Sequence, residues 1–287
     1  MTVVSILGVV GAGQMGAGIA QVAAVAGLAV VVTDINEPAL SRGKKTIADS
    51  LARLVKKEAR TQAQADDAQG RITWSLHLAA HGKCDFIVEA ASENEALKKK
   101  IFAELDGIAK PDAIFASNTS SISITRLGAA TKRPESFIGM HFMNPVPVMK
   151  LVELIRGMAT SDATWQITKA LAEKMGKTTT VSKDLPGFLA NRILMPMINE
   201  AFTALAEGVG SAEDIDTTMK LGMNHPMGPL VLADFIGLDT CLAIMQVLHD
   251  GFGDPRYRPS PLLRQYVDAG WFGKKTGRGV FSYTENK

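Results

Sequence analysis

Apolar and polar positions alternate with two different periods along the chain, and the pattern predicts strands and helices in turn. Val3–Val10 is β-branched, nearly continuous and followed by glycine, which is typical of a buried strand. The spacing then predicts a helix over Met15–Ala26, a strand over Leu28–Asp34 and a long helix from Pro38 to about Arg60. Further predicted strands are Phe86–Glu89, Ala113–Ser117, Phe137–His141, Leu151–Ile155 and Thr178–Ser182, and the clearest helix between them is Glu93–Ile108. This alternation predicts an α/β fold with a doubly wound, mostly parallel sheet.

The pattern changes near Pro186, after which every predicted element is a helix. Phe188–Glu207, Ala212–Lys220 and Pro229–Leu248 all have helical periodicity, with Gly and Pro between them. We therefore expect two domains, an α/β domain over residues 1–185 and a smaller all-helical domain over residues 186–287. Because a domain of about 100 residues builds only a small core, we expect its apolar helices to need a partner subunit.

The composition limits the classes of protein that the chain can be. Of 287 residues, 46% are hydrophobic and 21% charged, so a sizeable core can form and global disorder is excluded. The 31 basic and 29 acidic side chains give a net charge of +2, too balanced for a protein that binds nucleic acid by neutralising phosphates. Cys84 and Cys241 lack ligand spacing, so we expect neither a disulfide scaffold nor a metal site, and a reducing compartment such as the cytoplasm.

Residues 1–33 lack charged side chains and histidine, and residues 24–26 resemble a signal-peptidase site. A signal peptide, however, carries a basic segment before its apolar stretch, and this sequence has none there. A membrane span would have to accommodate Gln14, Gln21 and six glycines. We therefore expect no membrane association.

A glycine-rich turn connects the first predicted strand to the first predicted helix. Gly11, Gly13 and Gly16 form a GxGxxG run, and the next strand ends in Asp34, an acidic residue at the expected distance. Such a turn brings a pyrophosphate to the backbone and to the positive end of a helix. The acid would accept hydrogen bonds from an adenosine ribose and repel a 2′-phosphate, which favours NAD over NADP. The alternative is a strand–helix turn without a ligand.

Polar residues that could react follow two further predicted strands. Asn118–Ser121 follows Ala113–Ser117, at the strand end where parallel sheets bind ligands, although the same residues are common in helix caps and turns. His141 ends another strand, and a lone histidine is often only a core residue.

Glu153 stands between apolar neighbours in Leu151–Ile155, and a buried carboxylate needs a partner. The candidate cations are Lys150, Arg156 and, across a strand pair, His141. A His–Glu pair would be an oriented general base. Periodicity alone leaves the three partners open, because it does not show which strands are neighbours.

A basic stripe follows one face of the long predicted helix. It consists of Arg53, Lys56, Lys57 and Arg60. Most stripes of this kind are solvated surface, whereas the functional interpretation is a seat for a phosphorylated ligand.

Taken together, the motifs resemble one known family. They are GAGQMGAGIAQ from Gly11, EAASENEALK from Glu89, SNTSS from Ser117, HFMNPVPVMKL from His141, DLPGFLANR from Asp184, DIDTTMKL from Asp214, PMGPLVLADFIGLD from Pro226 and GKKTG from Gly273. In this order, across essentially the whole chain, they resemble the short-chain L-3-hydroxyacyl-CoA dehydrogenases, and most of all the bacterial 3-hydroxybutyryl-CoA dehydrogenase branch.

The resemblance implies a Rossmann domain that binds NAD, a helical domain that forms a homodimer, and an acyl-CoA substrate such as 3-hydroxybutyryl-CoA or acetoacetyl-CoA. It implies that His141 and Glu153 form a catalytic dyad, that Ser120 and Asn191 hold the reacting oxygen, and that Asn144 belongs to the reaction centre. Positions that match cofactor contacts, besides the three glycines, are Gln14, Met15, Asp34, Glu93, Lys98, Asn118, Ser120, His141, Asn144 and Lys274. Positions that match substrate contacts are Ser50 and Lys57 for the coenzyme A tail, together with Ser120 and Asn191.

Two other interpretations remain open at this point. A dehydrogenase of free 3-hydroxyacids that uses a lysine base would carry a lysine in residues 186–200, which contain none. A non-catalytic NAD-binding protein of the same fold would not need the complete set of Ser120, His141, Glu153 and Asn191. The departures from the family pattern are minor: Gly279–Phe281 lacks consecutive aromatics, and Trp74 is expected in a variable loop.

Overall fold

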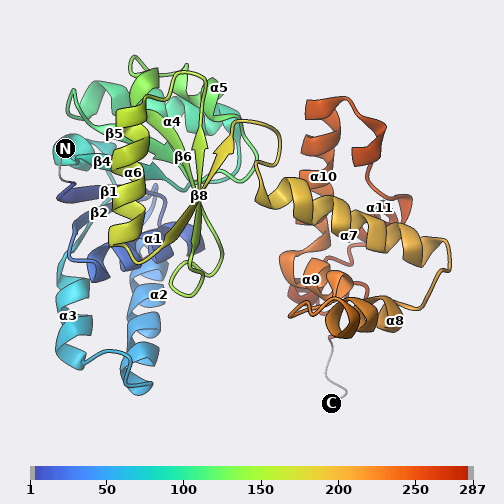
Figure 1. Cartoon of the computed structure of the whole chain (residues 1–287). Helices are drawn as coiled ribbons and strands as arrows, with labels where there is room; N and C mark the ends of the chain where they lie inside the picture. The colour runs from blue at the N-terminus through green and yellow to red at the C-terminus, as the bar shows by residue number, and fades with distance from the viewer. Residues whose placement is uncertain (1–3, 284–287) are drawn as a thin grey trace. The chain divides into compact units, whose positions relative to one another are not determined.

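An eight-stranded sheet forms the centre of residues 1–185, the first of two units in this computed structural model, which describes residues 4–283 (Figure 1). Its strands are β1 (Ile6–Val10), β2 (Ala29–Thr33), β3 (Ile72–Ser75), β4 (Phe86–Glu89), β5 (Ile114–Ser117), β6 (Phe137–Phe142), β7 (Leu151–Arg156) and β8 (Thr178–Lys183). They lie in the order β3-β2-β1-β4-β5-β6-β7-β8, and all neighbours are parallel except β6 and β7. The predicted mostly parallel, doubly wound sheet is confirmed.

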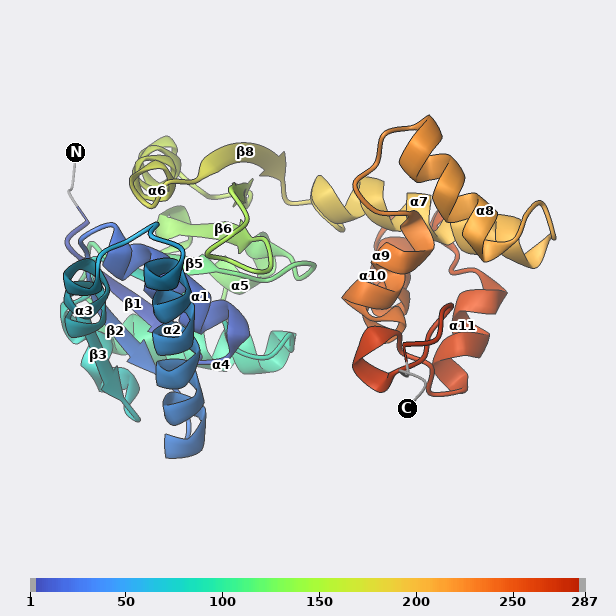
Figure 2. The same ribbon diagram turned by 90° about the horizontal axis from the view of Figure 1, so that it is seen from below.

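Helices cover both faces of this sheet, with α6 in front and α4 behind in Figure 1 and on opposite sides again in Figure 2. They are α1 (Gln14–Val25), α2 (Glu37–Lys56), α3 (Gln62–Gly70), α4 (Glu95–Ile108), α5 (Ile124–Gly128) and α6 (Asp162–Lys174). Asn36 accepts a hydrogen bond from the Ala39 N–H at the start of α2, with Pro38 in the first turn. Polar caps of this kind determine where each helix begins.

Three local predictions for this unit differ from the structure. The first strand begins at Ile6, and Val3 lies outside the described residues. Helix α2 ends at Lys56, because Glu58 has a positive φ of 57°, so Arg60 of the basic stripe lies beyond the helix. Trp74 lies in β3, the edge strand, and not in a loop.

The second unit, residues 186–287, is helical in its described part. Its α-helices are α7 (Ala190–Ala206), α8 (Ala212–Thr217), α9 (Pro229–Ile236), α10 (Leu238–Phe252) and α11 (Pro261–Asp268). The predicted single helix Pro229–Leu248 is therefore two helices, which meet at Gly237 with a φ of 105° that other residues rarely adopt. The buried carboxylate of Asp234 accepts hydrogen bonds from the Val280 and Phe281 N–H groups, which attaches the last described segment to α9.

Among residues 4–283, no single helix is long and apolar enough to cross a membrane. By length and composition only, α9 and α10 taken together would be long and apolar enough, but the two helices are bent by 98° relative to each other.

A buried histidine in the short helical segment Leu78–Lys83 packs against residues of β1 and β2. His81 is fully buried, its Nε2 lies 2.8 Å from Thr33 Oγ1, and its Nδ1 lies 3.7 Å from Cys84 Sγ. A Cβ at Gly8 would stand 2.5 Å from that Nδ1, so glycine makes the room for the ring. Burial lowers the pKa of His81 from 6.5 to about 4.

This pKa generates a prediction for acid stability. Between pH 6.5 and about 4 the unfolded chain protonates His81 while the folded chain does not, so stability falls as the pH falls through this window. The loss attributable to His81 reaches about 3 kcal/mol. His81→Gln should flatten the decline of melting temperature between pH 6.5 and 4, whereas His77→Gln, at an exposed site, should not. Equal slopes in the wild type and both variants would contradict this assignment.

Candidate active site

The turn between β1 and α1 has the backbone that a dinucleotide requires. Gly11 has a φ of 103°, and a Cβ there would lie 2.7 Å from Ala90 O. A Cβ at Gly16 would lie 1.8 Å from Gly11 O, so only glycine lets the helix approach the strand. A Cβ at Gly13 would meet nothing within 4 Å, so the space in front of α1 is open to a ligand. The N-terminus of α1 therefore fits a pyrophosphate.

Asp34 follows β2 and faces this turn. Its Oδ2 accepts a hydrogen bond from the Ala12 N–H at 2.7 Å, and its Oδ1 accepts one from the Ile35 N–H at 2.7 Å. A cavity of about 410 Å³ begins at Asp34, Gly11 and Gly13 and continues between apolar walls from Ile35, Leu76, Leu78, Leu97 and Ile101. A carboxylate at the mouth of an apolar slot fits an adenosine, with the ribose hydroxyls on Asp34 and the ring inside the slot.

Two further predicted cofactor residues begin α1. Gln14 donates from Nε2 to Asn144 Oδ1 at 3.0 Å, which joins the glycine turn to the segment after β6. Met15 is half-buried beside it. The structure therefore brings Gln14 and Asn144 together from positions far apart in the sequence.

The polar loop after β5 is held by a single carboxylate. Glu93 Oε1 accepts hydrogen bonds from Thr119 Oγ1 at 2.6 Å, from the Ser120 N–H at 2.9 Å and from the Ser120 and Ser121 hydroxyls at 3.2 Å each. Partial burial raises the pKa of Glu93, but the Thr119 hydroxyl, the Lys98 charge and the other donors outweigh it and hold the pKa below its ordinary value. Glu93 is thus ionised and organises the loop that carries Ser120.

Asn118, at the start of this loop, connects it to the next strand. Its Oδ1 accepts a hydrogen bond from the Phe142 N–H at 2.9 Å, and its own N–H donates to Glu89 O at 2.8 Å. The loop therefore lies beside the carboxyl end of β6, next to His141.

Lys98 on α4 is buried, although its motif match predicts a cofactor contact. Its side chain is 1% exposed, and Nζ lies 2.7 Å from Glu89 Oε1, 3.5 Å from Glu93 Oε2 and 3.2 Å from Ala91 O. Within the unit, its observed role is to neutralise carboxylates. Glu89 was not among the predicted site residues. Like Glu153, however, it is a lone acid in an apolar run, Phe86–Glu89, and such a buried carboxylate needs a partner.

His141 and Glu153 stand directly opposite each other in the antiparallel pair of β6 and β7. Nδ1 of the ring lies 3.2 Å from Glu153 Oε2, and the two side chains are 10% and 1% exposed. Of the other candidate cations, Arg156 pairs with Asp162 at 2.7 Å, and Lys150 is an exposed residue before β7. The carboxylate therefore orients the imidazole through Nδ1, which leaves Nε2 on the opposite side of the ring.

The predicted coenzyme A residues lie on α2 and at its end. Ser50 and Lys57 are seven positions apart, so they share one side of the helix, with Ser50 half-buried and Lys57 exposed. Arg53 and Lys56 stand in the last turn.

The two remaining predicted residues belong to the helical unit. Asn191 is buried in the first turn of α7, and its N–H donates to the O of Gly187, which has a φ of 74°. Lys274 is exposed, with Nζ 5.5 Å from the centroid of the Phe235 ring.

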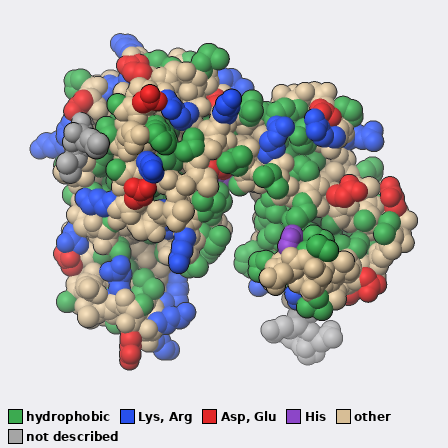
Figure 3. Space-filling model, viewed as in Figure 1, with side chains coloured by type: hydrophobic (Ala, Val, Ile, Leu, Met, Phe, Trp, Pro, Cys, Tyr) green, Lys and Arg blue, Asp and Glu red, His purple; other side chains and the backbone are tan. Residues whose placement is uncertain are grey.

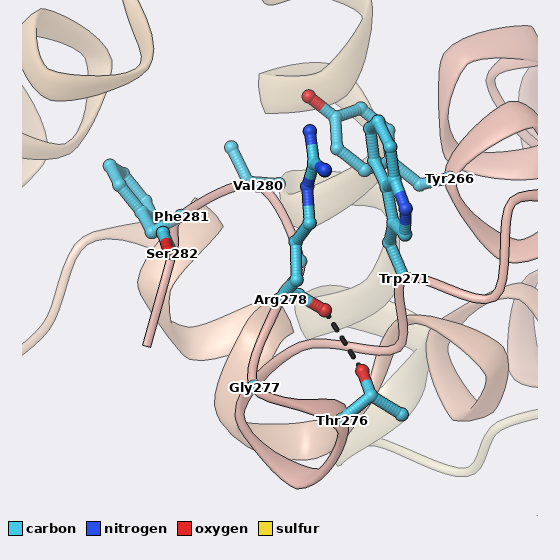
Figure 4. A pocket seen from close by; sticks show the side chains of 9 residues that line it. Tyr266, Trp271, Thr276, Gly277, Arg278, Val280, Phe281 and Ser282 are labelled. Atoms are coloured by element: carbon cyan, nitrogen blue, oxygen red, sulfur yellow. Dashed lines mark hydrogen bonds between the residues drawn. The ribbon is translucent and has the colours of Figure 1, made fainter. Parts of the chain in front are cut away.

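A cavity of about 570 Å³ lies elsewhere in the helical unit, between Tyr266, Trp271 and the segment Thr276–Ser282 (Figure 4). Arg278 stacks its guanidinium 3.5 Å from the centroid of the Trp271 ring. None of the predicted site residues lines this cavity. Within residues 4–283, no group of three or more His, Cys, Asp or Glu side chains could hold a metal ion.

The sheet, the glycine turn and the acid after β2 define the class of NAD-dependent dehydrogenases. Models of the 3-hydroxyacyl-CoA dehydrogenase NAD-binding domain and C-terminal domain match residues 6–185 and 187–283. The chain belongs to the 3-hydroxyacyl-CoA dehydrogenase family, and its cofactor is NAD. Both were implied by the motifs and are confirmed.

Several relatives are similar over nearly the full length. A 3-hydroxybutyryl-CoA dehydrogenase of Bradyrhizobium diazoefficiens is 58% identical over 98% of this chain and 96% of its own. A probable 3-hydroxybutyryl-CoA dehydrogenase of Bacillus subtilis is 57% identical over 96% of each chain. The crystal structure of (S)-3-hydroxybutyryl-CoA dehydrogenase from Ralstonia eutropha has a TM-score of 0.96 at 55% identity and covers 98% of this chain and all of that one.

The geometry around Asp34 generates a prediction for cofactor choice. Asp34→Ser should weaken the selectivity for NADH over NADPH about ten- to hundredfold, because it removes a charge-assisted hydrogen bond and the repulsion of a 2′-phosphate. The Michaelis constant for the acyl-CoA should hardly change. Asp49→Ser, which removes an exposed carboxylate of α2, is the control. An unaltered ratio of kcat/KM for the two cofactors in Asp34→Ser would refute the role of Asp34.

Proposed function

We propose that this chain interconverts (S)-3-hydroxybutyryl-CoA and acetoacetyl-CoA, with His141 and Glu153 as a general acid–base pair. The direct cross-strand contact of these two side chains carries the proposal, because it presents an oriented imidazole at the carboxyl end of the sheet. The names of the similar proteins supply the substrate class.

In this proposal each group has one task. When bound, NAD exchanges a hydride with C3 of the substrate. In oxidation, Nε2 of His141 takes the proton of the C3 hydroxyl, and in reduction it returns that proton to the oxygen. Glu153 holds the ring through Nδ1 and stabilises its protonated form. Ser120 donates to the C3 oxygen where charge develops, and Asn191 supplies a second donor.

The cofactor contacts in this proposal follow the structure of the first unit. The N-terminus of α1 at Gly13–Met15 binds the pyrophosphate, and Asp34 binds the adenosine ribose. Glu93, Asn118 and Asn144 lie around the loop and the strand end that carry Ser120 and His141. The motif match alone makes Lys274 a proposed cofactor residue, and Lys98 acts through the carboxylates that it neutralises.

We also propose that the helical unit forms a homodimer, as the sequence predicts. Figure 3 shows hydrophobic side chains gathered on the visible face of this unit. Large apolar side chains of the unit that are well exposed in the single chain are Leu189, Ile193, Val209, Leu221, Met223 and Phe235. A second copy would remove such side chains from water.

The dyad generates the central prediction. His141→Gln should lower kcat about 10²–10⁴-fold, because glutamine keeps a hydrogen bond but carries no proton at neutral pH. Glu153→Gln should also lower kcat strongly, since it removes the charge that orients and stabilises the imidazolium. The double variant should be little worse than His141→Gln alone, because residues that act as one unit lose activity non-additively.

The measurement is the oxidation of NADH with acetoacetyl-CoA, with NADH binding followed by fluorescence as the control for folding. NADH should bind all three variants. Wild-type turnover by His141→Gln, or losses that simply multiply in the double variant, would show that the pair is not the acid–base unit.

The proposed contact of Lys57 with the coenzyme A tail generates a second prediction. Lys57→Ala should raise the Michaelis constant for acetoacetyl-CoA about two- to fivefold and make it less salt-sensitive, because an exposed phosphate contact is modest and screened. A substrate truncated to the pantetheine arm should be unaffected. Lys45→Ala, on a different side of α2, is the matched control. Equal losses on both substrates would instead indicate damage to the fold.

A further inference from the structure

Glu89, the last residue of β4, is a fully buried carboxylate without a role in the reaction described above. Its Oε1 accepts hydrogen bonds from Lys98 Nζ and from the Ala91 N–H, both at 2.7 Å, and its Oε2 accepts one from Ser117 Oγ at 2.7 Å. Ser117 is its register partner on β5, immediately before the loop that carries Ser120. Charge and strand pairing therefore place Glu89 directly behind that loop.

The carboxylates of Glu89 and Glu93 both lie near the ammonium group of Lys98, and these three residues form a cluster. Lys98 Nζ lies 2.7 Å from Glu89 but 3.5 Å from Glu93, so it is bound mainly to Glu89. Lys98 faces Glu93 Oε2, whereas the other oxygen, Oε1, accepts the donors of Thr119, Ser120 and Ser121. This arrangement depends on the charge of Glu89, because a buried ammonium that loses one counter-ion is left uncompensated unless it approaches another carboxylate.

We propose that Glu89 is a positioning residue for the reaction centre: it keeps the Lys98 ammonium closer to itself than to Glu93 and so leaves Glu93 on the loop that carries Ser120. The importance of that loop for turnover rests on the function proposed above. Glu89, Lys98, Glu93 and the loop that carries Ser120 all belong to the first unit.

The consequence of removing the charge follows from these distances. In Glu89→Gln the buried Lys98 retains only Glu93 as a counter-ion, and its approach draws that carboxylate away from the hydroxyls of the loop. Ser120 then loses its fixed position. Because a displacement of about 1 Å at a reaction centre can cost about 100-fold in rate, we expect kcat to fall about 10- to 100-fold. The Michaelis constant for acetoacetyl-CoA at saturating NADH should change less than twofold, because the proposed coenzyme A contacts lie on α2 and Ser120 is proposed to act mainly where charge develops in the transition state.

Asp85 offers a matched control at the opposite end of the same strand. It precedes β4 and, like Glu89, accepts hydrogen bonds from a lysine, Lys110, and from backbone N–H groups, those of Ser5 and Ile6. Asp85→Asn therefore removes a more exposed carboxylate–lysine pair of the same kind at the other end of the strand. It should lower the melting temperature yet leave kcat within about twofold of the wild type.

The experiment compares kcat, KM and melting temperature for the wild type, Glu89→Gln, Glu89→Asp and Asp85→Asn. A fall of kcat in Glu89→Gln that is absent from Asp85→Asn, with KM unchanged, supports the proposal. A kcat for Glu89→Gln equal to that of Asp85→Asn overturns it. If Glu89→Gln does not fold, Glu89→Asp gives the answer: it retracts the carboxylate by one methylene, so a roughly tenfold lower kcat at unchanged KM supports positioning and a wild-type kcat overturns it.

Ser120→Ala separates this inference from the function on which it rests. If Ser120→Ala turns over at the wild-type rate, the proposed reaction centre is wrong. If Ser120→Ala is slow while Glu89→Gln is as fast as Asp85→Asn, the reaction centre stands and the positioning role of Glu89 fails.

Discussion

A carboxylate that becomes buried on folding needs a cation or several hydrogen-bond donors nearby. Strands β4 and β7 each contain one such buried carboxylate. Glu89 is balanced by Lys98, and Glu153 faces His141 across the sheet. Both pairs lie toward the edge of the sheet where β4, β5 and β6 end. The same requirement therefore places an oriented imidazole beside the polar loop of Ser120, and Glu93 holds that loop through its hydrogen bonds. Much of the arrangement of polar groups at this edge follows from the pairing of buried charges.

The reversal of strand direction at β7 makes the contact between His141 and Glu153 possible. In an antiparallel pair, residues that stand directly opposite each other point to the same face and lie close enough for their side chains to meet. β6 and β7 are the antiparallel neighbours in the sheet, and their register sets these two residues opposite each other. The parallel strands have a different task, because their carboxyl ends bring the glycine turn, Asp34 and the polar loop to one edge.

Most of the sheet could be predicted from hydrophobic runs, because strands such as β4 and β6 are buried on both faces and appear as short continuous apolar segments. The errors fell where local backbone conformation overrides periodicity. A positive φ at Glu58 follows the end of α2 and leaves Arg60 outside the helix, and Gly237 divides a continuous apolar pattern into two helices. Trp74 belongs to the edge strand β3, where one short segment with partial burial gives little periodic signal.

The residue types and their spacing were sufficient to identify the glycine turn, the acid after β2, the family and NAD, because each depends on a short run of chain or on collinear motifs. They also showed that Glu153 needs a partner. Periodicity left Lys150, Arg156 and His141 open as partners, and the family resemblance implied His141. Only the register of β6 and β7 in the tertiary structure shows that contact directly. In the same way, the contacts of Glu89 with Lys98 and Ser117 depend on the fold, which brings β4, α4 and β5 together. Sequence determines which charges must be buried, but pairing between distant segments determines what each charge meets.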